Sequence, residues 1–261
     1  MQIGLFFEDK INSNWSDIVF AGIGKKKQKL DSMRPLTEGE VARLKEEFLV
    51  EFTYNSNAIE GNTLTLRETA MVLEGITIDK KPLKDHLEVV GHKEAYEYVL
   101  DLVQEKVEFT EKVIKDIHSL VLMDKPKDRG VYRSVPVRIM GVNHEPPQPY
   151  LVPIQMEQLF VQYKEMKQTM HPLEAIARFH VLFEGVHPFI DGNGRTGRLI
   201  MNLELLKQGY LPINVKFADR RRYYECFHKF YEEGNNAKPM IELIGEYVEE
   251  MLDRYITILN S

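Results

Sequence analysis

A run of twelve residues between two amphipathic segments constrains this chain more than any other feature. It occupies residues 187–198 and reads His-Pro-Phe-Ile-Asp-Gly-Asn-Gly-Arg-Thr-Gly-Arg. Apolar residues recur at helical spacing in residues 172–184 before it and in residues 199–206 after it. Gly185 and Gly209 are suited to end these two segments, because glycine readily adopts the left-handed conformation that follows many helices. The run is therefore predicted to be a loop that joins two helices and begins the second.

The residue types in this loop suit phosphate chemistry. Gly192, Asn193 and Gly194 let the backbone approach a ligand, and the N-terminus of the following helix offers free N–H donors to an anion. Arg195 and Arg198 share one face of that helix, and guanidinium groups match phosphate oxygens. We expect this part of the chain to hold a phosphate-bearing ligand.

Two further side chains supply what a phosphate transfer needs. Asp191 offers a hard oxygen ligand to Mg²⁺, which usually takes one or two carboxylates together with substrate phosphates. His187 has an ordinary pKa near neutrality, so it can accept a proton from an attacking hydroxyl group. Phe189 is expected to anchor the loop in the core.

The run resembles the signature of the Fic family, His-Pro-Phe-x-Asp/Glu-Gly-Asn-Gly-Arg-x-x-Arg, at every defined position. The resemblance implies an all-α fold, a Fic-type helical bundle, and an enzyme that transfers AMP from ATP to a Tyr, Thr or Ser hydroxyl of a target protein and of itself. It also implies roles. His187 is the catalytic base, Asp191 the Mg²⁺ ligand, residues 192–194 the anion hole, and Arg195 and Arg198 the phosphate clamps.

Residues 56–61, Ser-Asn-Ala-Ile-Glu-Gly, end an earlier predicted helix. Ser56 and Glu60 share one face of it, and Glu60 lies in the last turn, where the helix dipole disfavours a carboxylate by about 0.3–1 kcal/mol. From composition alone, an exposed glutamate is the simpler interpretation. The segment also resembles the inhibitory motif of class II Fic proteins, Ser/Thr-x-x-x-Glu-Gly/Asn. That resemblance implies that Glu60 pairs with Arg198 and blocks productive seating of the ATP γ-phosphate.

Residues 130–141 change to an alternating pattern that is typical of a strand. Residues 141–144 are suited to a turn, so a small β-hairpin is predicted here. A surface hairpin is the plainer interpretation. The segment also resembles the flap beside the Fic active site, where the target backbone is aligned by strand addition. The resemblance implies that Val137, Arg138 and Ile139 dock the target.

A later aromatic segment, residues 220–233, is predicted to be a helix whose aromatic side chains are mostly core. The Fic resemblance places Tyr224 where a tyrosine that contacts adenine is expected. Tyr231 stands where the family often has asparagine. Either Asn235 substitutes for that asparagine or the base is contacted differently.

The chain is predicted to divide into three parts. Residues 1–104 are an N-terminal helical region that carries the inhibitory segment. Residues 105–235 are the Fic core that the resemblance implies, and residues 236–261 are a C-terminal helix. Residues 1–35 are expected to be irregular with one short helix. Capping boxes of the Thr-x-x-Glu form begin helices after Thr37 and Thr65, and Thr110 is a predicted N-cap. Further helices are expected at about residues 84–105, 110–122, 152–170 and 239–259.

Composition sets the remaining expectations. A net charge of −6 gives no basic footprint for nucleic acid. No apolar run is long enough to span a membrane, the N-terminus lacks the pattern of a signal peptide, and the lone Cys226 excludes an internal disulfide. We expect a cytoplasmic protein whose partners are ATP and a target protein, without nucleic acid or membrane, and with a possible homo-oligomer.

Three alternatives to AMP transfer stay open. In the first, Glu60 orients a water that removes AMP from a modified protein. In the second, another phosphate-containing group is transferred, which is open because Tyr231 stands where the family often has asparagine. The third is a non-catalytic nucleotide-binding module, against which His187 and Asp191 argue, because a binding module needs no base.

Overall fold

The computed structural model describes residues 13–139 and 144–260, with side chains from residue 20 onward. Every regular element in these ranges is a helix, which confirms the all-α expectation for this part of the chain. The elements are α1 (Ser13–Asp31), α2 (Glu38–Ile59), α3 (Leu66–Leu73), α4 (Leu83–Gln104), α5 (Glu111–Val121), α6 (Val152–Thr169), α7 (Pro172–Val186), α8 (Asn193–Lys207), α9 (Arg220–Glu232) and α10 (Lys238–Asn260), with short 3-10 helices at Pro149–Leu151 and Phe217–Asp219.

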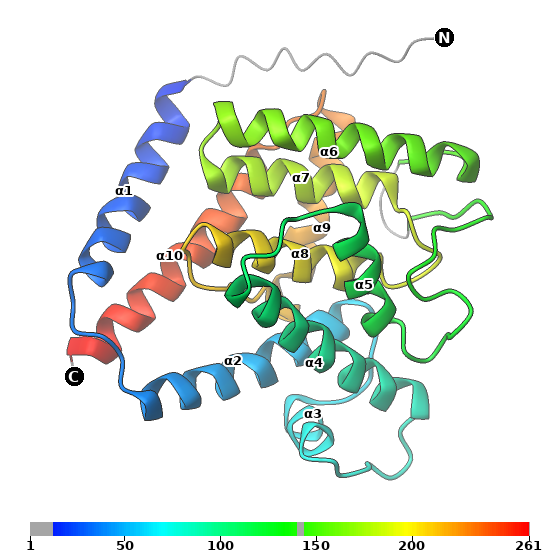
Figure 1. Ribbon diagram of the computed structural model, residues 1–261, viewed down its shortest axis with the longest axis horizontal. Coiled ribbons are helices and arrows are strands. Elements are labelled where there is room, and N and C mark those ends of the chain that lie inside the picture. The colour runs from blue at the N-terminus through cyan, green and yellow to red at the C-terminus, as the bar shows by residue number, and fades with distance from the viewer. Residues whose placement is uncertain (1–12, 140–143, 261) are drawn as a thin grey trace.

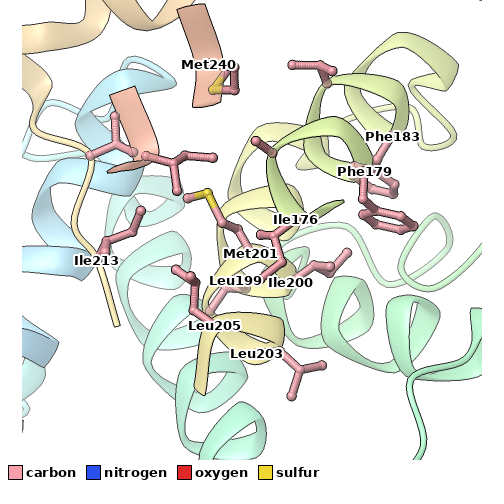
Figure 2. Packing of buried hydrophobic residues seen from close by; sticks show 14 of the residues in the cluster. Ile176, Phe179, Phe183, Leu199, Ile200, Met201, Leu203, Leu205, Ile213 and Met240 are labelled. Atoms are coloured by element: carbon pink, nitrogen blue, oxygen red, sulfur yellow. The ribbon is translucent and has the colours of Figure 1, made fainter. Parts of the chain in front are cut away.

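Helix α8 lies in the middle of the molecule (Figure 1). It contacts α7 on one side and α4 and α5 on another, while α2 reaches it with its C-terminal part. Figure 2 shows Leu199, Ile200 and Met201 of α8 gathered with Ile176 and Phe179 of α7. All of these side chains are buried, and each buried side chain of this size contributes about 1.5–3 kcal/mol to stability. The N-terminus of α8 is therefore held in place from several directions.

The predicted capping boxes are present. Glu40 N donates to Thr37 Oγ1 at 3.3 Å, and Thr37 N donates to Glu40 Oε2 at 2.7 Å. The same reciprocal pair joins Thr65 and Glu68 at the start of α3. Each such cap contributes about 0.5–2 kcal/mol. Local sequence alone therefore fixes where α2 and α3 begin.

The expectation of one short helix in residues 1–35 is wrong, because α1 is 19 residues long. It lies along α10 at the edge of the bundle (Figure 1). Lys26 Nζ lies 2.6 Å from both Glu249 Oε1 and Asp253 Oδ2 of α10. Lys26 thus contacts an acidic face of a helix more than two hundred residues away, which local propensity does not reveal.

Gly185 does not end α7, contrary to the prediction. The helix continues to Val186, and His187 takes the left-handed conformation at its C-terminus, with φ 47°. Gly185 lies inside the helix, where a Cβ atom would collide with the hydroxyl of Tyr231 on α9. Its role is close packing rather than helix termination.

The expected strand in residues 135–139 is not formed. Residues 140–143, on which the turn of the hairpin falls, lie outside the described residues, so no hairpin is shown. Pro136 and the nearby prolines at 146, 147 and 149 lack the N–H donors that a ladder needs. The segment is tied to the signature loop instead, since Arg133 N donates to Pro188 O at 3.0 Å.

The main hydrophobic cluster runs through all three predicted regions of the chain. It includes Phe52 of α2, Ile114 of α5 and Leu252 of α10. The three regions share one hydrophobic core. The division of the chain at residues 104 and 235 therefore stays a prediction from the sequence. Among the described helices, none combines the length and apolar character that a bilayer crossing requires.

Candidate active site

The signature loop is fixed by Phe189, as predicted, and by a histidine that the sequence did not single out. Phe189 is fully buried, and the ring of His118 stacks on it with centroids 3.6 Å apart. His118 Nδ1 accepts a hydrogen bond from Gly130 N at 2.8 Å, so its Nε2 carries the proton and donates to Asp191 O at 2.9 Å. Asn193 binds Phe189 through both ends of its side-chain amide, at 2.9 Å each. The Asn193 side chain thus holds the loop, and only its backbone N–H is available to an anion.

Arg133 supports the loop from the other side. Its side chain is buried, and its Nε donates to His187 O at 2.8 Å. This bond helps to hold His187 at a positive φ, which is uncommon for a residue other than glycine. The backbone of His187 is therefore fixed before any ligand arrives.

The imidazole of His187 is prepared to accept a proton. Its Nδ1 lies 3.3 Å from Glu184 O, and because a carbonyl only accepts, Nδ1 carries the proton and Nε2 keeps its lone pair. Burial lowers the pKa of His187 to about 4, so the ring is neutral at physiological pH. A neutral ring with a free Nε2 is what a general base requires.

Asp191 is ionised and already holds a cation. Burial alone would raise its pKa, but the Lys125 ammonium at 2.5 Å and the charge of Arg195 lower it to about 2. Its Oδ1 accepts from Gly192 N at 2.6 Å. No group of three or more metal-ligating side chains occurs among the described residues. One partly exposed carboxylate whose present partners are cations and a backbone N–H fits Mg²⁺ whose other ligands come from substrate phosphates.

Arg195 lies between two carboxylates. Its Nη2 is 3.3 Å from Asp191 Oδ1, and its Nη1 is 3.1 Å from Oε1 of Glu88, a buried residue of α4. Glu88 was not among the residues that the sequence patterns predicted for the site. An acidic residue next to Val89, on the apolar face of a predicted helix, is the signal that would have found it.

Arg198 is as enclosed as Arg195, with 1% of the surface of each exposed. Its Nη2 lies 2.7 Å from Glu60 Oε1 and 2.8 Å from Ser56 O, and its Nε donates to Ser56 Oγ at 3.1 Å. The ion pair that the Fic resemblance implies is therefore present. A Cβ atom at Gly194 would collide with Glu60 Oε1, so only glycine at position 194 accommodates Glu60 here.

Glu60, His187 and Arg198 line one cavity of about 170 Å³. Its lining comes from the end of α2, the C-terminal turn of α7, the first turns of α8, helix α9 and the segment before residue 140. Of the predicted site residues it includes Glu60, Arg138, Ile139, His187, Gly194, Arg198 and Tyr224. Asp191 and Arg195 lie beside it at the start of α8, and Val137 is not part of its wall.

Comparison with known proteins gives a consistent result. Residues 108–205 match the Fic/DOC family. A protein adenylyltransferase Fic from Drosophila yakuba is 34% identical over 251 residues, which is 92% of this chain and 50% of that protein. The chain belongs to the Fic/DOC family. It spans about half the length of the curated Fic relatives that it matches.

Solved Fic structures share the arrangement of nearly the whole chain. A Fic domain containing signaling protein from Bacteroides thetaiotaomicron has a TM-score of 0.82 and 27% identity, covering 93% of this chain and 97% of that one. Residues 134–508 of Fic-1 from C. elegans give a TM-score of 0.84 at 26% identity, covering 95% of this chain and 74% of that one. The Fic arrangement thus extends well beyond the segment that matches the family.

The departure at Tyr231 has a structural basis in this Fic protein. Tyr231 donates its hydroxyl to Val181 O at 2.6 Å and stacks on His144 with centroids 3.9 Å apart. His144 in turn donates from Nε2 to Gly185 O at 3.0 Å. Tyr231 therefore lines the cavity as an aromatic wall whose polar group is already used.

Proposed function

We propose that this chain is a protein adenylyltransferase that moves AMP from ATP to a Tyr, Thr or Ser hydroxyl of a target protein and of itself. The observation that carries the proposal is the neutral His187 imidazole in one cavity with the Arg198 guanidinium. One group takes a proton and the other binds a phosphate, so the cavity has both parts of a nucleotidyl transfer. The relatives named protein adenylyltransferase support this choice of reaction.

In the proposed reaction, His187 Nε2 takes the proton of the incoming hydroxyl group. The hydroxyl oxygen forms a bond to the α-phosphorus of ATP, the bond to the β-phosphate oxygen breaks, and pyrophosphate leaves. A positioned base typically contributes about 10²–10⁴-fold to the rate. The anion hole is predicted at residues 192–194, but Gly192 N donates to Asp191 Oδ1. The backbone N–H groups of residues 193–195 at the start of α8 are therefore proposed to hold phosphate oxygens together with the Arg195 guanidinium. Asp191 would hold Mg²⁺ together with those phosphates, and the ion would neutralise their charge.

The target docks, in this proposal, along residues 137–139. Arg138 and Ile139 line the cavity that contains His187, and the segment is not paired in a sheet within the described residues. Free backbone N–H and C=O groups at an extended segment can pair with a strand of a target protein. A target strand here would bring its hydroxyl group toward His187. Tyr224, which also lines the cavity, would contact the adenine.

Glu60 is proposed to inhibit the resting enzyme. Its carboxylate occupies Arg198, the cation that the γ-phosphate needs, at Nη2, which also donates to Ser56 O, while Arg198 Nε donates to Ser56 Oγ. ATP would then bind in a pose that does not react. Couplings of about 1–3 kcal/mol change an equilibrium about 5- to 150-fold, which is enough for such control.

Labelled ATP and mass spectrometry of the enzyme and of a lysate test the proposal. Wild type, Glu60→Gly, Arg198→Ala and the double variant are compared. Glu60→Gly should raise transfer about 5- to 150-fold, visible first as AMP on the enzyme itself. Arg198→Ala and the double variant should both stay inactive, because the phosphate clamp is gone. Unchanged transfer in Glu60→Gly would rule out the inhibitory role.

Removal of AMP from a modified protein is the second candidate, because the Glu60 carboxylate lines the same cavity as His187 and would be able to orient a water. A premodified target separates the two directions. Under this candidate, Glu60→Gly loses AMP release while it gains transfer. ATP turnover that leaves AMP on no protein would favour the transfer of another phosphate-containing group, and ATP binding without turnover would favour a nucleotide-binding module.

A further inference from the structure

A second glutamate, Glu184, lies in the wall of the same cavity. It stands in the last turn of α7 and is 8% exposed. Its Oε2 is 3.9 Å from Nδ1 of His187, and its Oε1 has no hydrogen-bond partner among the described residues. A buried carboxyl oxygen without a partner is costly, so its position calls for an explanation.

Glycine in α8 makes room for this carboxyl group. A Cβ atom at Gly197 would collide with Glu184 Oε1 and would stand 3.1 Å from Cε1 of His180. The absence of a side chain at position 197 brings Glu184 against the backbone of α8, one residue before Arg198. The carboxyl group and the guanidinium thus approach the cavity from neighbouring helices.

Arg198 has one nitrogen to spare. Its Nε and Nη2 bind Ser56 and Glu60, whereas its Nη1 is buried without a hydrogen-bond partner among the described residues. An unused donor on Arg198 and an unused oxygen on Glu184 therefore belong to two buried side chains that line the same cavity. Glu60 occupies one side of the guanidinium, and Glu184 is the other carboxyl group within its electrostatic reach.

The charges around Glu184 explain why it does not hold Arg198 at rest. Burial, and then the negative charge of Glu60, raise the pKa of Glu184 to about 8, against the opposing effect of Arg198. The other groups that face Glu184 are neutral near pH 7. Burial lowers the pKa values of the imidazoles on α7 and raises those of the phenols on α9. These neutral groups are His180, His187, Tyr223 and Tyr231.

We propose that Glu184 is a second carboxyl group for Arg198, which attracts the guanidinium through Nη1 when it loses its proton, favours the departure of Glu60 and so leaves Nη2 free for a phosphate. The two carboxylates repel each other and compete for one cation. A proton on Glu184 therefore stabilises the Glu60–Arg198 pair, and by linkage its loss weakens that pair. Full coupling to one proton changes the equilibrium about tenfold for each pH unit between the two pKa values of Glu184.

The first experiment follows the carboxyl carbon of Glu184 by NMR in protein labelled with carbon-13 glutamate, and Glu184→Gln assigns the resonance. The wild-type midpoint should lie near 8, and Glu60→Gln should move it to lower pH because the repelling charge is gone. A midpoint at the ordinary glutamate value, or one that Glu60→Gln leaves unchanged, would overturn the inference.

The second experiment rests on the proposed function and measures AMP transfer from about pH 6 to about pH 9. Wild-type transfer should rise across this range, while Glu184→Gln, which keeps the neutral shape, should stay inhibited throughout. Glu174→Gln, on the same helix but remote from the cavity, should follow the wild-type profile. A rise in Glu184→Gln equal to that of wild type would overturn the inference. If no variant transfers AMP, the proposed function fails, and the NMR titration alone decides about Glu184.

Discussion

The hydroxyl group of Tyr231 lies against the backbone of Gly185, in the space that a side chain at residue 185 would fill. The same hydroxyl donates to Val181 O one turn earlier in α7. Helices α7 and α9 therefore approach each other closely at the turn that precedes His187. The position of the proposed base depends on this contact between two residues outside the signature.

Gly185→Ala should destabilise the protein by about 1–3 kcal/mol, because the added methyl group forces Tyr231 out of its packed position. Urea unfolding measures this change. Gly24→Ala is the matched control, since Gly24 is also in a helix but has nothing within 4 Å of the Cβ position. The control should be neutral or stabilising by up to about 1 kcal/mol. Equal stability of Gly185→Ala and wild type would contradict the close packing.

His187→Ala should reduce AMP transfer about 10²–10⁴-fold and leave ATP binding largely intact, because the base touches the incoming hydroxyl rather than the nucleotide. Transfer and calorimetric ATP binding are measured in the Glu60→Gly background, where inhibition does not mask the effect. Transfer near the parent rate would eliminate His187 as the base.

The acid limb of transfer should reflect the lowered pKa of His187. Burial brings this pKa to about 4, so the base loses its free lone pair only at pH values near 4. We expect the rate of Glu60→Gly/Glu184→Gln, which removes both glutamates from the profile, to fall with a midpoint close to 4. A midpoint near 6.5, the ordinary histidine value, would mean that burial does not lower the pKa of His187 in the working enzyme.

Lys125→Met should lower the Mg²⁺ concentration that half-saturates nucleotide binding, because the Lys125 ammonium and the metal compete for the Asp191 carboxylate. Asp191→Ala should abolish the Mg²⁺ dependence altogether. Nucleotide binding is titrated with Mg²⁺ by calorimetry. Lys127→Met is the control, since Lys127 is an exposed neighbour in the same loop. The competition is refuted if Lys125→Met and Lys127→Met give the same Mg²⁺ dependence.

Stability should carry the signature of Glu184 as well. Its pKa rises from 4.5 to about 8 on folding, so the folded state holds the proton more tightly than the unfolded state. This contribution is fully present below about pH 4.5 and is lost as the pH rises toward 8. The unfolding free energy of wild type should therefore fall, relative to that of Glu184→Gln, as the pH rises from about 4.5 to about 8. Urea unfolding at three pH values tests it, and a constant difference would contradict the raised pKa.

Local signals predicted much of this molecule. Thr37 and Thr65 specify helix starts through atoms three residues away, and the glycine-rich loop could be read from its own sequence. The pairing of Glu60 with Arg198 came only from the family resemblance.

The features that the sequence did not reveal join distant residues. Lys125 meets Asp191 across 66 positions and Arg133 meets His187 across 54, and neither basic residue stands out among its neighbours. The length of α1 and the place of Gly185 likewise depend on helices that are distant in sequence, α10 for α1 and α9 for Gly185. Such features follow from tertiary contacts, which local propensity does not specify.

The pairing of Arg195, Arg198 and the neighbouring Lys125 with carboxylates has a consequence for how fast ATP arrives. Arg198 faces Glu60, Arg195 faces Glu88, and Lys125 holds Asp191. Such a cleft exerts little net attraction on a polyanion beyond about 10 Å, so the resting protein does not steer ATP toward itself. When Glu60 is removed while Glu184 keeps its proton, as expected for Glu60→Gly well below pH 8, Arg198 carries an uncompensated positive charge, and the association rate becomes both faster and sensitive to ionic strength. Relief of inhibition would then act on nucleotide capture as well as on the pose of the bound phosphates.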